Sequence, residues 1–167
     1  MAVNTKQPTL ALMTKEAQLA FKQQLKQFAE QQLQQRITVI REKMEAAQQS
    51  ANNEEKSSAG DKYETSRAMN HLEKEMHGKQ LAENLKELSL LYEISVSSLH
   101  DKVIPGTVVQ CKAVCFFIAA GLGKQTIANT LVIFLSPHAP LAAQLRQKQV
   151  GDTWEFNKQL LTIEAIF

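Results

Sequence analysis

The lack of proline across most of the first hundred residues is the feature that most restricts the fold of this chain. No proline occurs between Pro8 and Pro105, and the only glycines in that interval are Gly60 and Gly78. Because proline and glycine most often interrupt helices, such a stretch is typical of long helices. Gly60 lies in a polar run near its middle, so we predict two helices joined by a turn near residues 56–62.

The apolar residues of the first predicted helix alternate spacings of four and three, the pattern of a coiled coil. They are Leu33, Ile37, Ile40, Met44, Ala47 and Ala51. The second predicted helix continues this pattern, with a shift of phase near Gly78, through Met69, Leu72, Met76, Leu81, Leu85, Leu88 and Tyr92. Each apolar stripe is narrow, so we expect an antiparallel coiled-coil hairpin in which each helix buries the stripe of the other. The alternative is a helical bundle that is completed by dimerisation.

After Pro105 the sequence changes to short β-branched and aromatic runs separated by turn residues, which favours strands. We predict a strand at 107–118, a hairpin turn at 121–124, a return strand at 128–136 and a short helix at 141–147. A strand at 153–156, a tight turn at 157–158 and a last strand at 160–166 follow. The chain is therefore predicted to be an α+β protein with a lead-in at 1–13, the antiparallel coiled-coil hairpin at 14–98 and a compact antiparallel β domain with one short helix at 99–167.

Composition excludes several classes of function. The formal net charge is only +2, which gives no electrostatic reason to expect stand-alone binding to DNA or to an anionic membrane. The longest apolar runs are shorter than the roughly 20 residues that span a bilayer. No basic and apolar leader opens the sequence, so we expect a cytoplasmic protein. Cys111 and Cys115 alone make neither a disulfide framework nor a four-ligand zinc site, and we interpret them as two small core residues on one face of one strand.

Two acidic residues stand at the predicted turn. Asp61 and Glu64 are three positions apart at the start of the second predicted helix, a spacing that places both on one helix face. One interpretation is a pair of carboxylates delivered by the tip of the hairpin. The other is a capping box, with Asp61 as N-cap and Glu64 three residues later. The residues alone favour the second, although a cap does not exclude a function.

Two stretches resemble a known family. Gly60-Asp61-Lys62-Tyr63-Glu64-Thr65 is similar to the tip motif of the bacterial transcript-cleavage factors GreA and GreB, with Thr65 where that family has Asn. Ser136-Pro137, followed by Leu141, Leu145 and Val150-Gly151-Asp152, resembles the loop, short helix and turn of their C-terminal domain. The order of the predicted elements agrees over nearly the whole chain. The resemblance implies an N-terminal coiled coil and an FKBP-like C-terminal domain.

The resemblance also implies a function. A Gre-like transcription elongation factor binds RNA polymerase, inserts its tip into the secondary channel and stimulates cleavage of backtracked RNA by the polymerase, without being an enzyme itself. Asp61 and Glu64 would be the catalytic tip acids and would help to hold Mg²⁺ of the polymerase active site, so the chain needs no cofactor of its own. Residues expected to contact the polymerase, its channel or the nascent RNA are Tyr63, Arg67, Ser136, Pro137, Pro140 and Leu141.

Two other functions stay open at this stage. One is a secondary-channel regulator that binds RNA polymerase without stimulating cleavage. The other is a coiled-coil adaptor with no link to transcription. A stand-alone enzyme is the least favoured class, because the sequence carries no motif for a nucleophile, a metal or a cofactor.

Overall fold

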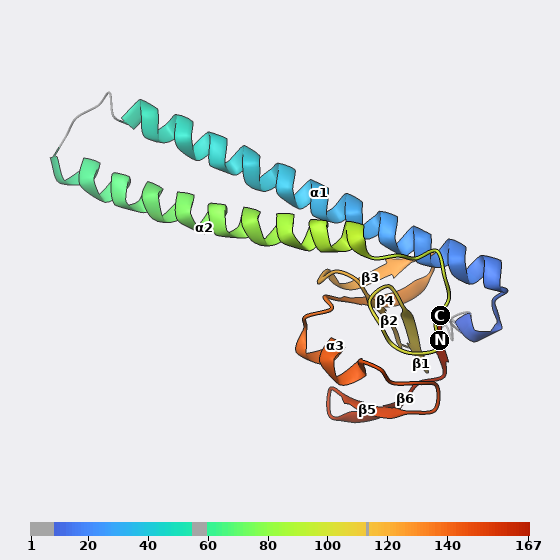
Figure 1. Cartoon of the computed structure of the whole chain (residues 1–167). Helices are drawn as coiled ribbons and strands as arrows, with labels where there is room; N and C mark the ends of the chain where they lie inside the picture. The colour runs from blue at the N-terminus through green and yellow to red at the C-terminus, as the bar shows by residue number, and fades with distance from the viewer. Residues whose placement is uncertain (1–8, 55–59, 113) are drawn as a thin grey trace, which may run out of the picture. The chain divides into compact units, whose positions relative to one another are not determined.

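The structure of the protein is a computed structural model that describes residues 9–54, 60–112 and 114–167 (Figure 1). The predicted turn at 56–62 therefore lies largely outside the described residues, as do the side chains of Asp61 and Tyr63. The chain divides into two compact units. One is formed by residues up to Glu30 together with Ser89–Phe167, and the other is Gln31–Leu88.

The α+β fold class is confirmed. Two long helices, α1 (Lys15–Glu54) and α2 (Gly60–Glu93), precede a β region that contains one short helix, α3 (Pro140–Leu145). A short 3-10 helix at Leu10–Leu12 comes before α1. The Oγ1 atom of Thr14 accepts a hydrogen bond from the backbone N–H of Ala17 at 3.2 Å, which caps the first turn of α1.

The first unit is built on a five-stranded sheet with the strand order β3-β4-β2-β1-β7. Its strands are β1 (Val108–Cys111), β2 (Val114–Ile118), β3 (Gly123–Ile127), β4 (Thr130–Leu135) and β7 (Ala165–Ile166). A separate hairpin consists of β5 (Thr153–Phe156) and β6 (Gln159–Thr162). All pairs are antiparallel except β2 and β4, which run parallel.

The prediction of one strand at 107–118 is wrong, because this stretch folds into the antiparallel pair β1 and β2. Lys112 lies between them with φ 48°, a left-handed conformation that reverses the chain. The predicted hairpin turn at 121–124 is also wrong. The hairpin is formed by β3 and β4, whose connecting residues Ala128 and Asn129 have φ 48° and 60°. Positive φ at both central residues matches the twist of a two-residue hairpin, and Ala at the first position concealed that turn.

The last predicted strand, 160–166, is likewise divided. Its first part belongs to β6, and its last part, β7, joins the edge of the main sheet beside β1. The turn between β5 and β6 is Asn157-Lys158, with φ 50° and 62°. That turn agrees with the tight turn that the sequence predicts there.

Both faces of the main sheet are covered. On one face Phe116 packs edge-on against Trp154 and Phe156, with ring centroids 5.0 and 5.2 Å apart. This face also carries α3, whose Ala142 and Leu145 are buried in the same core. On the other face Phe28 of α1 lies 5.7 Å from Phe134. The first unit therefore has a three-layer core, with the sheet in the middle.

Two lysines of α1 hold the segment that follows α2. The Nζ atom of Lys22 donates a hydrogen bond to the carbonyl of Ser98 at 2.7 Å, and that of Lys26 donates to the carbonyl of Ile94 at 2.7 Å. The Lys22 side chain is fully buried, and burial lowers its pKa to about 8. The Nζ atom of Lys26 also forms an ion pair with the Oε1 atom of Glu30, at 3.9 Å. These contacts tie the start of α1 to the end of α2 within the first unit.

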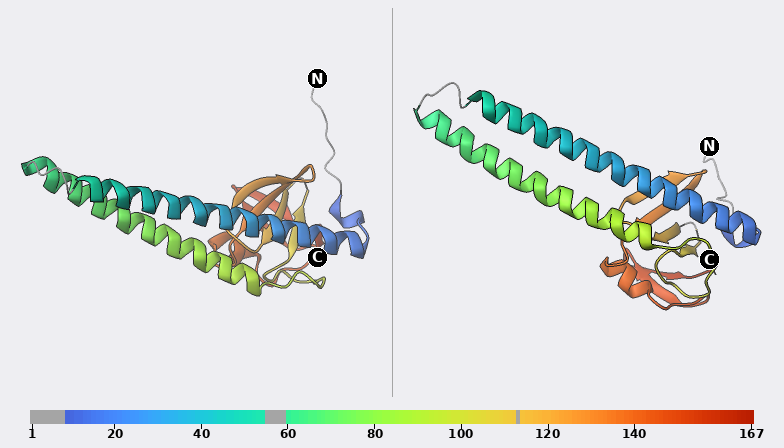
Figure 2. Two further views of the ribbon diagram at one scale, coloured as in Figure 1. Left: turned by 90° about the horizontal axis from the view of Figure 1, so that it is seen from above. Right: turned by 45° about the horizontal axis from the view of Figure 1, so that its top comes forward.

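The second unit is the helical hairpin itself, and in both views of Figure 2 its two helices run side by side. The α1 stripe is placed as predicted: Leu33, Ile37 and Ile40 are buried, and Met44, Ala47 and Ala51 are half-buried. None of the helices that the structure describes has a stretch long and apolar enough to cross a membrane.

The α2 stripe contradicts the predicted coiled-coil seam. Met69, Leu72 and Met76 are 66%, 67% and 50% exposed, whereas His77 and Leu88 are buried. The reason is the phase shift at Gly78: at 3.6 residues per turn, Leu88 lies roughly 100° around the helix from Met69. One helix cannot turn both stripes toward the same neighbour. Leu88 faces inward, so the stripe of Met69 faces outward. The predicted stripe around Leu88 is itself only partly buried, because Leu85 and Tyr92 are exposed.

Candidate functional site

The predicted tip residues lie at the start of α2. Glu64 and Arg67 are both exposed there, three positions apart on the helix. The structure assigns Gly60 to α2, so Asp61 lies inside the helix and not at the N-cap position that the capping-box interpretation requires. The direction of the Asp61 and Tyr63 side chains lies outside the described residues, so the pairing of the two tip carboxylates stays a prediction.

Among the described residues there is no group of three or more His, Cys, Asp or Glu side chains that would hold a metal ion. A pair of carboxylates is a sufficient contribution to a Mg²⁺ ion that already has other oxygen ligands, because Mg²⁺ retains water molecules and needs few protein groups.

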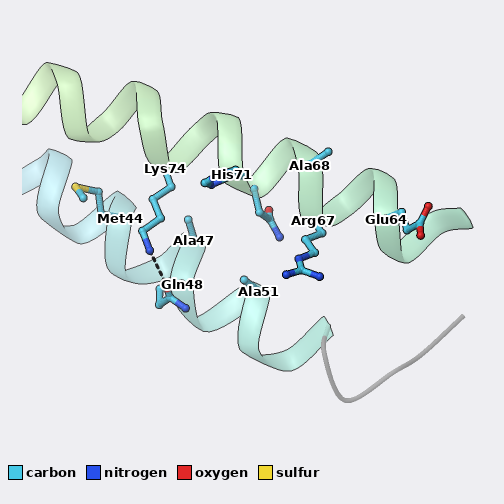
Figure 3. A pocket seen from close by; sticks show the side chains of 10 residues that line it. Met44, Ala47, Gln48, Ala51, Glu64, Arg67, Ala68, His71 and Lys74 are labelled. Carbon is cyan, nitrogen blue, oxygen red and sulfur yellow. Dashed lines mark hydrogen bonds between the residues drawn. The ribbon is translucent and has the colours of Figure 1, made fainter. Parts of the chain in front are cut away.

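Next to the tip, the two helices enclose a cleft with a volume of about 470 Å³ (Figure 3). We call it the interhelical cleft and define it by the residues that α1 and α2 contribute. The α1 wall is apolar apart from one amide, and consists of Met44, Ala47, Gln48 and Ala51. The α2 wall is polar apart from Ala68 and carries two cations and one acid; it consists of Glu64, Arg67, Ala68, Asn70, His71 and Lys74.

The cationic side chains of the cleft point toward α1. Figure 3 shows Arg67 and Lys74 extending from α2 across the gap. The Nζ atom of Lys74 donates a hydrogen bond of 3.4 Å to the side-chain oxygen of Gln48. Within the described part of the chain, neither Arg67 nor Lys74 forms an ion pair with a carboxylate. The cleft therefore combines an apolar wall with two cations that have no carboxylate partner among the residues that the structure describes.

Sequence reasoning found part of this cleft and missed the rest. It named Glu64 and Arg67 but not His71, Lys74 or the α1 wall. A signal was present, because Arg67, His71 and Lys74 are spaced four and three apart and therefore share one helix face. The face was overlooked because the Met69 stripe was expected to be the one that meets α1.

The other predicted contact residues belong to the first unit. The backbone carbonyl of Ser136 accepts a hydrogen bond from Ala139 at 2.9 Å, and Pro140 is the first residue of α3. Pro140 is exposed, Pro137 is half-buried, and Leu141 packs partly against the core. The exposed part of this loop is therefore narrow, centred on His138 and Pro140.

The two cysteines are core residues, although not on one face as predicted. Cys111 lies on β1 opposite Val114, whereas Cys115 lies on β2 opposite Gln110, so they point to opposite faces of the sheet. Burial raises the pKa of both thiols, and the indole N–H of Trp154 donates to the Cys111 sulfur at 3.5 Å. Neither thiol is a nucleophile at neutral pH, because the thiolate is the reactive form.

Comparison with known proteins adds no relative: no protein-family model, no curated protein and no solved structure matches this chain. The resemblance to the transcript-cleavage factors therefore rests on the two short stretches of sequence alone.

Proposed function

We propose that this protein is a Gre-like transcription elongation factor. In this proposal it binds bacterial RNA polymerase, inserts the end of its helical hairpin into the secondary channel and promotes cleavage of backtracked RNA. The observation that carries the proposal is the exposed Glu64 carboxylate at the start of α2, three residues after Asp61, within the motif that resembles the family's tip.

The chemistry that the tip would assist is hydrolysis of a phosphodiester bond. That reaction needs positive charge at the non-bridging oxygens and an activated water, which a pair of metal ions supplies. The polymerase provides the ions. Asp61 would help to retain the more weakly held one, and Glu64 would orient or deprotonate the water. Tyr63 and Arg67 would contact the channel or the RNA beside them.

The length of the hairpin supports the proposal. α2 runs for 34 residues, which corresponds to roughly 50 Å of helix, so its first turn is far along the helix from its last. A rod of this kind suits delivery of a reactive group through a narrow opening. The role of the protein would be to complete an active site that belongs to its partner.

The decisive experiment is a cleavage assay on backtracked RNA polymerase complexes. The wild-type protein is compared with Asp61→Asn/Glu64→Gln, which removes both tip charges with little change of size. Loss of one group that supports a metal typically costs roughly 10–100-fold, so we expect at least that reduction. The matched control is Glu73→Gln/Glu83→Gln, which makes the same charge change at two exposed positions farther along α2 and should leave cleavage unchanged.

The outcomes separate this proposal from its alternatives. Equal cleavage with the wild type and the tip variant would end the idea of a catalytic tip. Binding to RNA polymerase without any stimulation by the wild type would favour a non-cleaving secondary-channel regulator. Failure to co-purify with the polymerase would favour an adaptor unrelated to transcription.

We also propose that the Ser136–Leu141 loop docks on the polymerase. Within the loop His138 and Pro140 are exposed, so His138→Glu/Pro140→Glu alters the surface without entering the core. This variant should no longer co-purify with the polymerase. Gln159→Glu/Thr162→Glu, with the same added charge at exposed positions of β6, should still co-purify. Equal recovery of both variants would exclude the loop as the docking surface.

A further inference from the structure

The interhelical cleft has a composition that an ordinary helical hairpin lacks. Where two helices of a hairpin meet, both faces are normally apolar. Here the half-buried side chains of Met44, Ala47 and Ala51 face α2, but α2 presents Arg67 and Lys74 to them (Figure 3). The apolar stripe of α2, which includes Met69 and Met76, points away from the cleft.

Arg67 and Lys74 give the cleft two positive charges, and His71 lies between them on the same helix face. Arg67 and Lys74 are about two helical turns apart, so both can reach an anion that lies along this face. Glu64 also lines the cleft, and it makes no ion pair with either cation within the described part of the chain. An anion bound between the helices would pair with both cations.

The dimensions and the hydrogen-bonding groups narrow the class of ligand. A volume of about 470 Å³ lies in the range of small-molecule sites. Arg and Lys together favour a phosphate over a single carboxylate, because a phosphate offers more oxygens and more charge. The Met44, Ala47 and Ala51 wall would cover an apolar or aromatic body.

We infer that the interhelical cleft binds a nucleotide, with its phosphates on Arg67, His71 and Lys74 and its base against the Met44, Ala47 and Ala51 wall. Such a ligand would contact both helices, with its phosphates on α2 and its base on α1. The inference concerns the isolated protein and does not depend on the proposed role in transcription.

The test is calorimetric titration of the full-length protein with ADP. We expect saturable binding with one ADP per chain. Because a hydrogen bond to a charged group contributes about 1.5–3 kcal/mol, Arg67→Gln and Lys74→Gln should each weaken the affinity roughly 10–100-fold. Lys79→Gln is the matched control: it removes one lysine charge from an exposed position of α2 that does not line the cleft, and its affinity should stay within about twofold.

A second arm tests the apolar wall. Pyrophosphate, which lacks the base and the sugar, should bind at least about tenfold more weakly than ADP, because it leaves the apolar side chains in water. Helical content by circular dichroism shows that each variant is folded. Absence of saturable ADP binding by the wild type, or equal losses in Arg67→Gln and Lys79→Gln, would overturn the site. Equal affinities for pyrophosphate and ADP would overturn the assignment of a nucleotide.

Discussion

Phe116 and Met69 are both large apolar side chains, yet Phe116 is 0% exposed and Met69 is 66% exposed. The difference extends to the two units to which they belong. The sheet unit buries aromatic rings on both faces, with Phe116 against Trp154 on one side and Phe28 against Phe134 on the other. In the hairpin unit Gln31–Leu88, α1 has a buried stripe, whereas α2 buries His77 and Leu88 and leaves the Met69, Leu72 and Met76 stripe exposed. Stability should therefore reside mainly in the sheet unit, and the hairpin is free to carry chemistry on its surface.

The sharpest test of this comparison is the truncation of one large side chain in each unit. Phe116→Ala should lower the free energy of unfolding by about 3–5 kcal/mol, because it leaves a cavity in a closely packed core. Met76→Ala should change it by less than about 0.5 kcal/mol, since that side chain is half exposed. Urea unfolding followed by Trp154 fluorescence and circular dichroism measures both. Similar losses would show that the outward α2 stripe is covered in solution.

Replacement by alanine should change the stability in opposite directions at two glycines. Gly106 has φ 92°, and a Cβ atom there would lie 2.5 Å from the carbonyl oxygen of Ser95, so Gly106→Ala should cost about 2–4 kcal/mol. Gly78 lies inside α2 with nothing within 4 Å of the added atom, and Gly78→Ala should stabilise the helix by roughly 0.5–1 kcal/mol. Thermal unfolding followed by circular dichroism compares them. Destabilisation by Gly78→Ala would indicate a strained or closely contacted helix at that point.

The buried Lys22 predicts a dependence of stability on pH. Burial lowers its pKa from 10.5 to about 8, so folding opposes protonation of this amine. Below pH 8 Lys22 is protonated in the folded protein, so the full free-energy cost of burying the charged amine lowers the stability. Between about pH 8 and 10.5 the unfolded chain binds more protons than the folded one, so this contribution to stability rises with pH.

The measurement compares wild type with Lys22→Met by urea unfolding at several pH values. From pH 7 to pH 10 the wild type should gain about 1–3 kcal/mol relative to the variant. Gln23→Met is the control, because neither its native nor its new side chain titrates, and its difference from wild type should be constant. A constant difference for Lys22→Met as well would mean that the amine reaches water in solution.

Residue types and spacings were sufficient to predict the two helices, the buried α1 stripe and the α+β class. These features depend on local preferences and on a single regular period. The sequence also indicated Glu64 and Arg67 as candidate site residues. Glu64 belongs to the Gly60–Thr65 motif, Arg67 follows it, and both lie beside the predicted turn between the helices. The division of 107–118 and the hairpin turn between β3 and β4 were missed, because the left-handed residues Lys112, Ala128 and Asn129 are not the glycine that usually marks such turns.

The sequence by itself determined that α2 carries two apolar stripes separated by a shift at Gly78, and that Arg67, His71 and Lys74 share another face. Which face meets α1 was decided only by the tertiary structure, because every face of a helix is compatible with the same local pattern. The structure buries Leu88, and this corresponds to one particular rotation of the helix about its axis. The same rotation turns Met69, Leu72 and Met76 outward and places the cations opposite the apolar wall of α1.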